Sequence, residues 1–243
     1  MIRSIEDAAR VLSQAKKVAV LTGAGVSQES GIETFRDENG VWSKLDPMIW
    51  ATVEGFLSQP ENVWDWYEQR RLTIRNSKPN AGHLALSKME SIFESLAVAT
   101  QNIDGYHQSA GSGVVRELHG NIFKNKCLAE DICKNVFDSS VTPPKCLECG
   151  SFIRPDVVWF GEMLPEKEWS LARDDVQECD VYMVIGTSGM VWPAAGLPTI
   201  AKRKGAKIII INTTESEIDQ RADVLIRGKS GEVLPQILKL LEK

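Results

Sequence analysis

Five short apolar runs constrain the fold of this sequence more than any other feature. They occupy residues 18–21, 96–100, 181–185, 207–211 and 224–226. Most of them end at a glycine or a polar residue, as buried strands do. Helical stretches lie between the runs, and the one before the first run covers residues 4–16 and opens with a Ser-x-x-Asp capping box. Strands that alternate with helices predict an α/β fold with a Rossmann-like, doubly wound parallel sheet.

The charge pattern and the lengths of the apolar runs argue against two classes of partner, nucleic acids and membranes. Lys and Arg number 28 and Asp and Glu 33, so the net charge is -5, and the basic residues form no stripe that could neutralise a phosphate backbone. We therefore expect no direct nucleic-acid binding. Residues 1–10 lack the apolar core of a secretory signal, and no apolar run is long enough to span a bilayer. We expect a cytoplasmic monomer without a membrane partner.

Three polar segments carry residue types suited to cleaving a nicotinamide dinucleotide. They read Gly-Ala-Gly-Val-Ser at 23–27, Thr-Gln-Asn-Ile-Asp at 100–104 and Glu-Leu-His-Gly-Asn at 117–121. A glycine turn before a helix offers backbone N–H groups to phosphate. Amides and a carboxylate suit a ribose and its leaving group, and an imidazole can move a proton near neutral pH.

Each segment also has a purely structural interpretation. The glycines are compatible with a tight turn, Asn102 and Asp104 with an Asx turn, and His119 with a structural histidine. An ordinary dinucleotide fingerprint would also need a second strand ending in an acidic residue about 20 residues later, which is not clear here. The three segments therefore point to a nucleotide site only in combination.

Longer motifs resemble one known family. Residues 23–36, which read Gly-Ala-Gly-Val-Ser-x-x-Ser-Gly-Ile-x-x-Phe-Arg, resemble the signature of the sirtuins, the NAD-dependent protein lysine deacylases. Further segments resemble sirtuin motifs in the same order, at residues 100–104, 118–120, 157–162, 186–188 and 228–233. Because independent motifs agree in order over nearly the whole chain, the sequence is identified as a member of this family, with NAD as its cofactor.

The resemblance implies a reaction and roles for three residues. In sirtuins the acyl-lysine oxygen attacks the ribose carbon that bears nicotinamide, and a ribose hydroxyl then attacks the resulting alkylimidate, which yields 2'-O-acyl-ADP-ribose. His119 matches the catalytic histidine, whose ordinary pKa of about 6.5 suits the base of the second step. Asn102 and Asp104 match the residues that hold nicotinamide and its ribose.

The same resemblance implies a set of cofactor contacts. The matching residues are Gly23, Ala24, Gly25, Ser27, Phe35, Arg36, Gln101, Asn102, Ile103, Asp104, Gly186, Thr187, Ser188, Asn212 and Ser230. Phe35 and Arg36 lie in the stretch that resembles the mobile cofactor-binding loop. This loop departs from the family pattern at Glu33, where proline is common, and at Asp37, where glycine is common.

Four cysteines predict a structural zinc site. They are Cys127, Cys133, Cys146 and Cys149. Five residues separate the first two, twelve residues separate the two pairs, and two residues separate the last two. Four thiolates can complete a tetrahedral zinc site. The first pair is wider than the Cys-x2-Cys usual in sirtuins. The alternative is four reduced thiols in a loop. We exclude Cys179, which precedes an apolar run and is expected to be a buried small hydrophobe.

A helix expected over residues 58–71 bears on substrate choice. A Ser-x-x-Glu box from Ser58 and an early proline open it. Tyr67 and Arg70, together with Ala51, resemble the sirtuin subgroup that removes succinyl, malonyl or glutaryl groups. An arginine fork and a tyrosine hydroxyl bind a carboxylate, and alanine leaves room for the longer chain. The alternative is a solvated helix in which Arg70 pairs with Glu68 or Asp65.

The expected partner is an acylated-lysine protein or peptide. Residues 157–159 and 189–192 resemble the two edges between which the substrate backbone adds a strand, and the substrate contacts would include Val158, Trp159 and Phe160. Removal of acetyl groups from lysine is also compatible with the predicted acyl preference. Two other functions remain open, transfer of ADP-ribose onto protein and noncatalytic sensing of NAD or ADP-ribose, although His119 and Asn102 favour catalysis.

The chain of 243 residues has room for a large domain and a smaller one. We expect a Rossmann-like NAD-binding domain in residues 1–31, 80–122 and 156–243. Two stretches break the strand and helix alternation, and we expect them to form a smaller zinc-binding and helical domain. Residues 32–79 would be the cofactor loop and helical module, and residues 123–155 the zinc-binding module.

Overall fold

The computed structural model describes residues 4–34, 40–129 and 136–243. Three of the expected site residues, Phe35, Arg36 and Cys133, lie outside the described residues.

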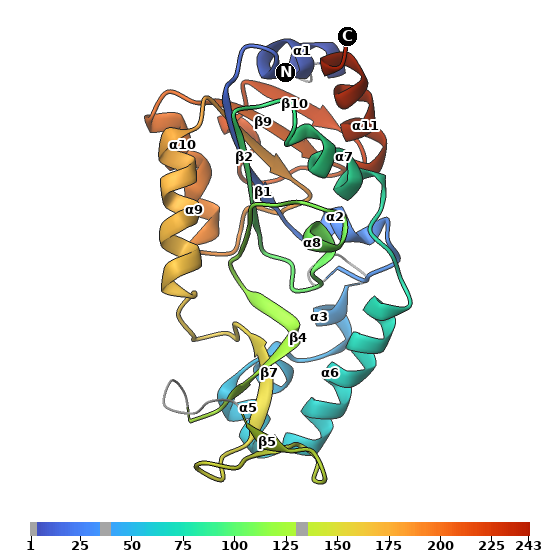
Figure 1. Cartoon of the computed structure of the whole chain (residues 1–243), viewed down its shortest axis with the longest axis vertical. Helices are drawn as coiled ribbons and strands as arrows, with labels where there is room; N and C mark the ends of the chain where they lie inside the picture. The colour runs from blue at the N-terminus through green and yellow to red at the C-terminus, as the bar shows by residue number, and fades with distance from the viewer. Residues whose placement is uncertain (1–3, 35–39, 130–135) are drawn as a thin grey trace.

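A six-stranded parallel sheet forms the larger half of the molecule, in the upper part of Figure 1. Its strands are β1 (Lys17–Thr22), β2 (Ser95–Thr100), β3 (Val115–Glu117), β8 (Val181–Ile185), β9 (Lys207–Asn212) and β10 (Val224–Arg227). The spatial order is β10-β9-β8-β1-β2-β3, and every neighbouring pair is parallel. The predicted Rossmann-like, doubly wound sheet is confirmed, and all five predicted apolar runs are strands.

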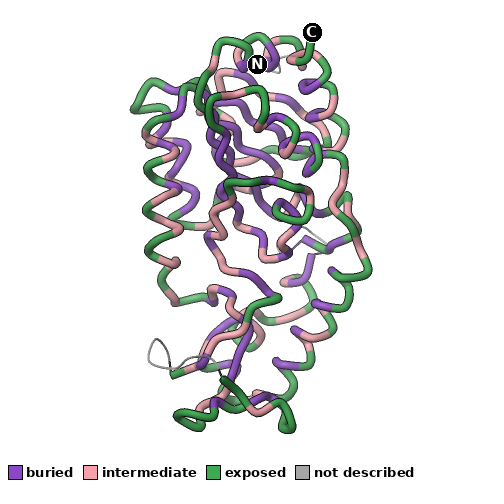
Figure 2. The backbone as a smooth tube through the Cα atoms, viewed as in Figure 1, coloured by how far each residue is buried: buried purple, intermediate pink, exposed green. Residues whose placement is uncertain are grey.

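Helices cover both faces of this sheet. The helices α1 (Ile5–Leu12), α7 (Ala81–Met89) and α11 (Ser230–Leu241) pack on one face, and α9 (Glu166–Glu178) and α10 (Leu197–Arg203) on the other. Val18 and Val20 of β1 face the first group, whereas Ala19 and Leu21 face the second. Burial on both faces explains why the strands read as continuous apolar runs, and Figure 2 shows this buried centre.

The second, smaller lobe lies below the sheet in Figure 1. Its elements are α3 (Val41–Lys44), α4 (Pro47–Trp50), α5 (Val53–Ser58), α6 (Pro60–Arg75), β4 (Gly120–Cys127), β5 (Phe137–Asp138), β6 (Lys145–Cys146) and β7 (Ile153–Val157). Strand β4 pairs with β7 in antiparallel fashion, and α6 contacts both. The lobe has its own apolar core, which includes Phe56, Val63, Tyr67 and Trp159.

Two helix starts test the capping predictions. Ser4 caps α1, and Asp7 completes the predicted capping box. The box predicted at Ser58 is wrong, because Ser58 ends α5 and its hydroxyl donates to the carbonyl of Gly55 at 2.7 Å. Helix α6 instead begins at Pro60, whose fixed φ suits the first helical position.

Among the described helices, none combines the length and the apolar character needed to cross a membrane.

Candidate active site

The site begins where the strand order reverses, between β1 and β8. In an open α/β sheet this switch point leaves a crevice outside the carboxyl ends of the strands. Gly23 follows β1, Gly186 follows β8, and the N–H of Gly25 donates to the carbonyl of Gly186 at 2.9 Å. A Cβ on Gly23 would lie 2.7 Å from the Gly186 oxygen, and one on Gly25 would lie 2.9 Å from its Cα. The two turns therefore touch backbone to backbone, which only glycine permits.

The first turn opens α2 (Ala24–Gln28), whose N-cap is Gly23. Bare N–H groups at such a helix start bind phosphate oxygens well. Ala24 and Gly25 are only half-buried there, whereas Ser27 on the next turn is 2 % exposed. The Gly25 N–H is already bonded to Gly186, so the fold presents the partly exposed backbone of Ala24 at the crevice and turns the serine inward.

Asn102, Ser27 and Asp104 form one buried network below the glycine turn. The Asn102 Nδ2 donates to the Gly23 carbonyl at 3.0 Å and to the Ser27 hydroxyl at 3.1 Å. The Ser27 hydroxyl in turn donates to Asp104 Oδ2 at 2.6 Å. The backbone N–H of Tyr106 donates to the other carboxylate oxygen, Oδ1, at 2.9 Å. These contacts hold an amide and a carboxylate at the end of β2 in one fixed arrangement.

Burial disfavours the charged form of Asp104 and raises the pKa of its carboxyl group, although the Ser27 hydroxyl and the Tyr106 N–H oppose the shift. Arg70 also stabilises the charge at longer range. An ionisable group that is both buried and specifically hydrogen-bonded in a crevice is typical of a functional site.

His119 lies between β3 and β4, next to the same strand end. Its Nδ1 is 3.0 Å from the carbonyl oxygen of Gln101. A carbonyl can only accept, so Nδ1 carries the proton of the neutral ring and Nε2 carries the lone pair. The backbone of His119 also accepts a hydrogen bond from Val158 N at 2.9 Å, which joins the histidine to the segment after β7.

Polar groups link the loops that follow β2, β8 and β9. The Gln101 Nε2 donates to the Thr187 hydroxyl at 3.0 Å, and the Asn212 Nδ2 donates to the Thr187 carbonyl at 3.0 Å. Ser188 is half-buried beside them, as is Ile103, whose carbonyl accepts from the backbone of Ile122. The expected cofactor residues from three separate strand ends are thus brought together.

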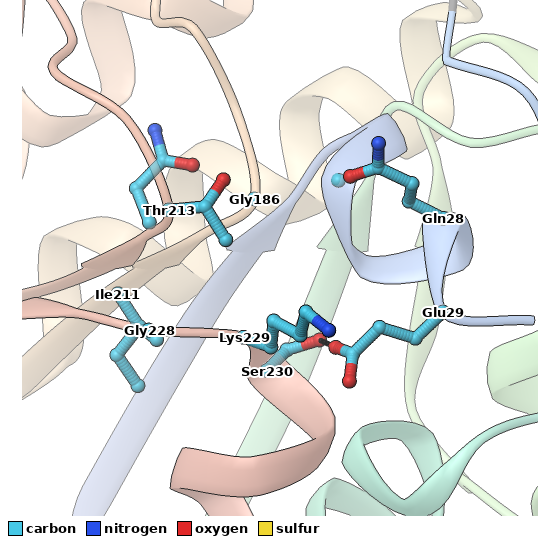
Figure 3. A pocket seen from close by; sticks show the side chains of 10 residues that line it. Gln28, Glu29, Gly186, Ile211, Thr213, Gly228, Lys229 and Ser230 are labelled. Atoms are coloured by element: carbon cyan, nitrogen blue, oxygen red, sulfur yellow. Dashed lines mark hydrogen bonds between the residues drawn. The ribbon is translucent and has the colours of Figure 1, made fainter.

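A cavity of about 280 Å³ opens beside the glycine turns, between the ends of β8 and β9 and the start of α11. Its lining residues are Gly25, Gln28, Glu29, Gly186, Ile211, Asn212, Thr213, Gly228, Lys229 and Ser230. Figure 3 shows the Glu29 carboxylate reaching Ser230, whose hydroxyl donates to it at 3.0 Å. The Gly231 N–H donates to the same Oε1 atom at 2.8 Å. Glu29 therefore ties the end of α2 to the start of α11 at the wall of the cavity.

Tyr67 and Arg70 lie on one side of α6, in the smaller lobe. The Tyr67 hydroxyl accepts a 2.8 Å hydrogen bond from the Trp159 indole N–H. Burial raises the pKa of Tyr67 to about 12 despite this donor, so the hydroxyl keeps its proton at neutral pH. The Arg70 Nη2 donates to the Glu33 carbonyl at 3.3 Å. Glu68 forms an ion pair with Arg71. The alternative expectation had paired this acid with Arg70.

The remaining substrate candidates adjoin this group. Ala51 is 6 % exposed, and its carbonyl accepts from the N–H of Phe160 at 2.8 Å. Trp159 is 2 % exposed, Val158 is half-buried and Phe160 is 41 % exposed. The segment after β7 therefore runs from the histidine to the tyrosine and arginine of α6.

Cys127, Cys146 and Cys149 form a separate cluster. Their sulfur atoms all lie within 4.8 Å of one another, and the Cys127 and Cys149 sulfurs are 3.5 Å apart. Ligands at a Zn–S distance of about 2.3 Å in a tetrahedron are about 3.8 Å apart, so this group fits zinc. Strand β4 separates Cys127 from His119, a span on the order of 20 Å. The cluster is thus suited to a structural role rather than a catalytic one.

Sequence reasoning missed two residues that shape the crevice. Glu29 reaches residues about 200 positions away, and no local pattern indicates that contact. Asn80 caps α7, and its Nδ2 also donates to the Val26 carbonyl at 2.7 Å and to Ser30 at 3.0 Å. Asparagine is a common N-cap residue, but no local pattern indicates its bond to the α2 segment.

The comparisons with known proteins agree with one another. A model of the Sir2 family matches residues 23–193. A relative from Pyrobaculum aerophilum named NAD-dependent protein deacylase 2 is 44% identical over 239 residues, which cover 97% of this chain and 95% of the relative. A solved complex of a Sir2 homolog with NAD is 40% identical, with a TM-score of 0.89 and coverage of 99% of this chain and 95% of that one.

A solved complex of Sir2 with a p53 peptide and NAD+ is 32% identical, with a TM-score of 0.86 and coverage of 98% of both chains. The matched family span exceeds half of the sequence, and the relative aligns almost end to end. The chain therefore belongs to the Sir2 family, as its motifs predicted.

Proposed function

We propose that this chain is an NAD-dependent protein lysine deacylase that favours acyl groups ending in a carboxylate, such as succinyl, malonyl and glutaryl. Its products would be nicotinamide and 2'-O-acyl-ADP-ribose. One observation carries the proposal, which is that these polar groups gather at the switch point of the sheet. The buried network of Asn102, Ser27 and Asp104 lies against the glycine turn. His119 is hydrogen-bonded to Gln101, the residue next to Asn102.

The cofactor would occupy the crevice along the strand ends. The start of α2 and the loop at Gly186 would hold its phosphates and adjoining ribose, and the loops at Asn212 and Ser230 would hold its adenosine. The cavity beside Ser230 supports this assignment because it lies on the same side as the glycine turns. Bound NAD supplies an electrophilic ribose carbon and a nicotinamide leaving group.

Asn102 and Asp104 would position the reacting sugar. The Asn102 amide is already fixed by the Gly23 carbonyl and Ser27, so it needs little reorganisation when the cofactor binds. The Asp104 carboxylate, held by two donors, would fix the ribose and favour positive charge developing nearby.

His119 would act as general base. The Gln101 carbonyl holds the proton on Nδ1, which leaves Nε2 to take a proton from a ribose hydroxyl. The bond from Val158 N to the His119 carbonyl couples this base to the segment proposed to pair with the peptide. The complex of Sir2 with a p53 peptide supports a peptide partner for this chain, and backbone pairing along this segment would bind it in extended form.

Tyr67 and Arg70 would recognise the end of the acyl group. A neutral phenol donor and a guanidinium suit a carboxylate, whereas an acetyl methyl offers them no acceptor. Ala51 is small and lies beside Phe160, so its side chain would take up little space next to the acyl chain. Zinc bound by the cysteines would stabilise the lobe without touching the reaction.

A peptide assay tests this proposal. One peptide sequence carrying either succinyl-lysine or acetyl-lysine is incubated with the protein and NAD, and nicotinamide and acyl-ADP-ribose are followed by mass spectrometry. We expect NAD-dependent loss of both groups, with kcat/KM about tenfold higher for succinyl, since one charge-assisted pair is worth about that much. Arg70→Met should remove this bias, and Arg75→Met, an exposed arginine of the same helix, should keep it.

Other outcomes would identify the two alternative functions. ADP-ribose attached to protein without loss of the acyl group would indicate a transferase. Binding of NAD without nicotinamide release would indicate a sensor. Equal rates on both peptides would leave a deacylase and would remove only the carboxylate preference.

A further inference from the structure

The hydrogen bond between Trp159 and Tyr67 has a fixed direction. An indole N–H can only donate, so the Tyr67 oxygen is the acceptor of this 2.8 Å bond. Trp159 is 2 % exposed and Tyr67 is 3 % exposed, so the pair is shielded from bulk water. The single phenolic proton must therefore be directed away from the indole.

Trp159 is itself held on several sides. The Glu162 carboxylate accepts from its backbone N–H at 2.7 Å, and the Arg154 guanidinium carbon lies 4.1 Å from the ring centroid. Arg154 also forms an ion pair with Glu162, and Arg154 is 1 % exposed. The Phe56 ring packs 5.4 Å from the indole. The indole N–H thus has a defined position before any substrate binds.

The same contacts bridge two segments that are far apart in the chain. Trp159 follows β7, beside the segment whose backbone joins His119, whereas Tyr67 belongs to α6 next to Arg70. The tyrosine ring is also stacked edge-on against Trp66 at 4.7 Å, which restrains its plane. With the ring restrained and the oxygen accepting from Trp159, rotation of the hydroxyl is the main freedom left to Tyr67.

We infer that Trp159 is a positioning residue for acyl specificity: its indole N–H occupies the Tyr67 oxygen and so directs the phenolic proton toward a carboxylate at the end of the acyl group. The inference rests on the proposed function of Tyr67 and Arg70. Trp159 would act through Tyr67 and would not itself bind the carboxylate. An acetyl group lacks the acceptor, so its removal should not depend on this bond.

A double-mutant cycle tests the inference. Trp159→Phe keeps a ring against Arg154 but removes the N–H, and Tyr67→Phe removes the hydroxyl. We expect Trp159→Phe to raise the ratio of the succinyl KM to the acetyl KM about fivefold, which is the usual contribution of one hydrogen bond, whatever the change common to both peptides. In the Tyr67→Phe background the tryptophan change should have no further effect on this ratio.

Two further variants separate this role from general packing. Trp64→Phe replaces another buried tryptophan, one that packs with the cysteines, and should leave the acyl bias unchanged. Replacing Trp159 by benzothienylalanine exchanges only the N–H for sulfur and keeps the ring size. If Trp159→Phe fails to fold, this isostere gives the same comparison, and it should reproduce the rise in the ratio of the succinyl KM to the acetyl KM.

The outcomes that would overturn the inference are distinct from failure of the proposed function. Equal losses on succinyl and acetyl peptides in the isostere would show a structural role for Trp159. Additive effects of Trp159→Phe and Tyr67→Phe would show that the bond does not orient Tyr67. A wild-type protein without any succinyl bias would instead overturn the carboxylate site, and the positioning role with it.

Discussion

The Ser27 hydroxyl donates a 2.6 Å hydrogen bond to Asp104 although the two residues are 77 positions apart. This bond joins the turn after β1 to the loop after β2 and stabilises the charged carboxylate against its burial. Loss of the donor should therefore raise the pKa of Asp104 further.

Ser27→Ala should shift the acid limb of the pH profile. If Asp104 acts as a carboxylate, activity falls as pH drops through its pKa, so a higher pKa moves that fall to higher pH. The measurement is kcat/KM against pH for wild type and variant. Ser112→Ala is a matched control, because that hydroxyl is buried without a partner among the described residues. An unchanged acid limb would remove Asp104 from the reaction as a carboxylate.

His119→Ala should lower turnover about 10²- to 10⁴-fold, the range for loss of a general base. Binding of NAD should change little, since the histidine is assigned to proton transfer rather than to the phosphates. Turnover is measured by nicotinamide release and NAD affinity by calorimetry. Turnover within tenfold of wild type would exclude His119 as the base.

Glu29→Gln should raise KM for NAD about three- to tenfold and change kcat little. The carboxylate oxygen accepts from both Ser230 and Gly231, and a neutral amide oxygen accepts more weakly. Glu232→Gln, at a nearby exposed acid that lies 3.9 Å from the Lys229 ammonium, is the control. A KM equal to that of wild type would show that the α2 to α11 link does not shape the cofactor site.

Cys146→Ser should lose bound zinc and lower the melting temperature, because the buried cluster around the cysteines is small, with Trp64 and Ile153 beside them, and would gain folding energy from the metal. Cys179→Ser should keep the metal, since Cys179 is buried beneath the sheet and donates to the Val176 carbonyl. Metal content is measured by mass spectrometry alongside thermal melts. One zinc per wild-type chain is expected, and retention of zinc by Cys146→Ser would contradict the assigned ligand set.

Two buried histidines should make the fold sensitive to acid. Burial lowers the pKa of His83 to about 4 and that of His107 to about 3, and their rings lie 4.9 Å apart. The unfolded chain binds these protons near pH 6.5 and the folded chain does not, so stability falls as pH drops below about 6.5. The loss between pH 7 and 5 should be on the order of 3 kcal/mol.

Urea unfolding at several pH values measures this dependence. His83→Gln should roughly halve the slope of the unfolding free energy against pH over that window, whatever its effect at pH 7. A slope identical to that of wild type would show that His83 does not titrate in this window.

Much of the fold could be predicted because strands covered by helices on both faces carry short apolar runs. β8 is apolar throughout, and β1, β2, β9 and β10 carry apolar runs with polar residues only at their ends. β3 could not be predicted, since it has three residues, lies at the sheet edge and contains Arg116 and Glu117. The capping box predicted at Ser58 is wrong although the Ser-x-x-Glu pattern is present in the sequence, because the preceding helix α5 uses that serine in its own last turn.

The sequence by itself determined the family, the strand runs and the identity of the polar residues at the strand ends, because these features depend on local composition and spacing. Only the tertiary structure decided which of those residues touch. The Trp159 bond to Tyr67 spans 92 positions and the Glu29 bond to Ser230 spans 201. Such contacts follow from the order of strands in the sheet and from the packing of two lobes, and no short stretch of sequence contains that information.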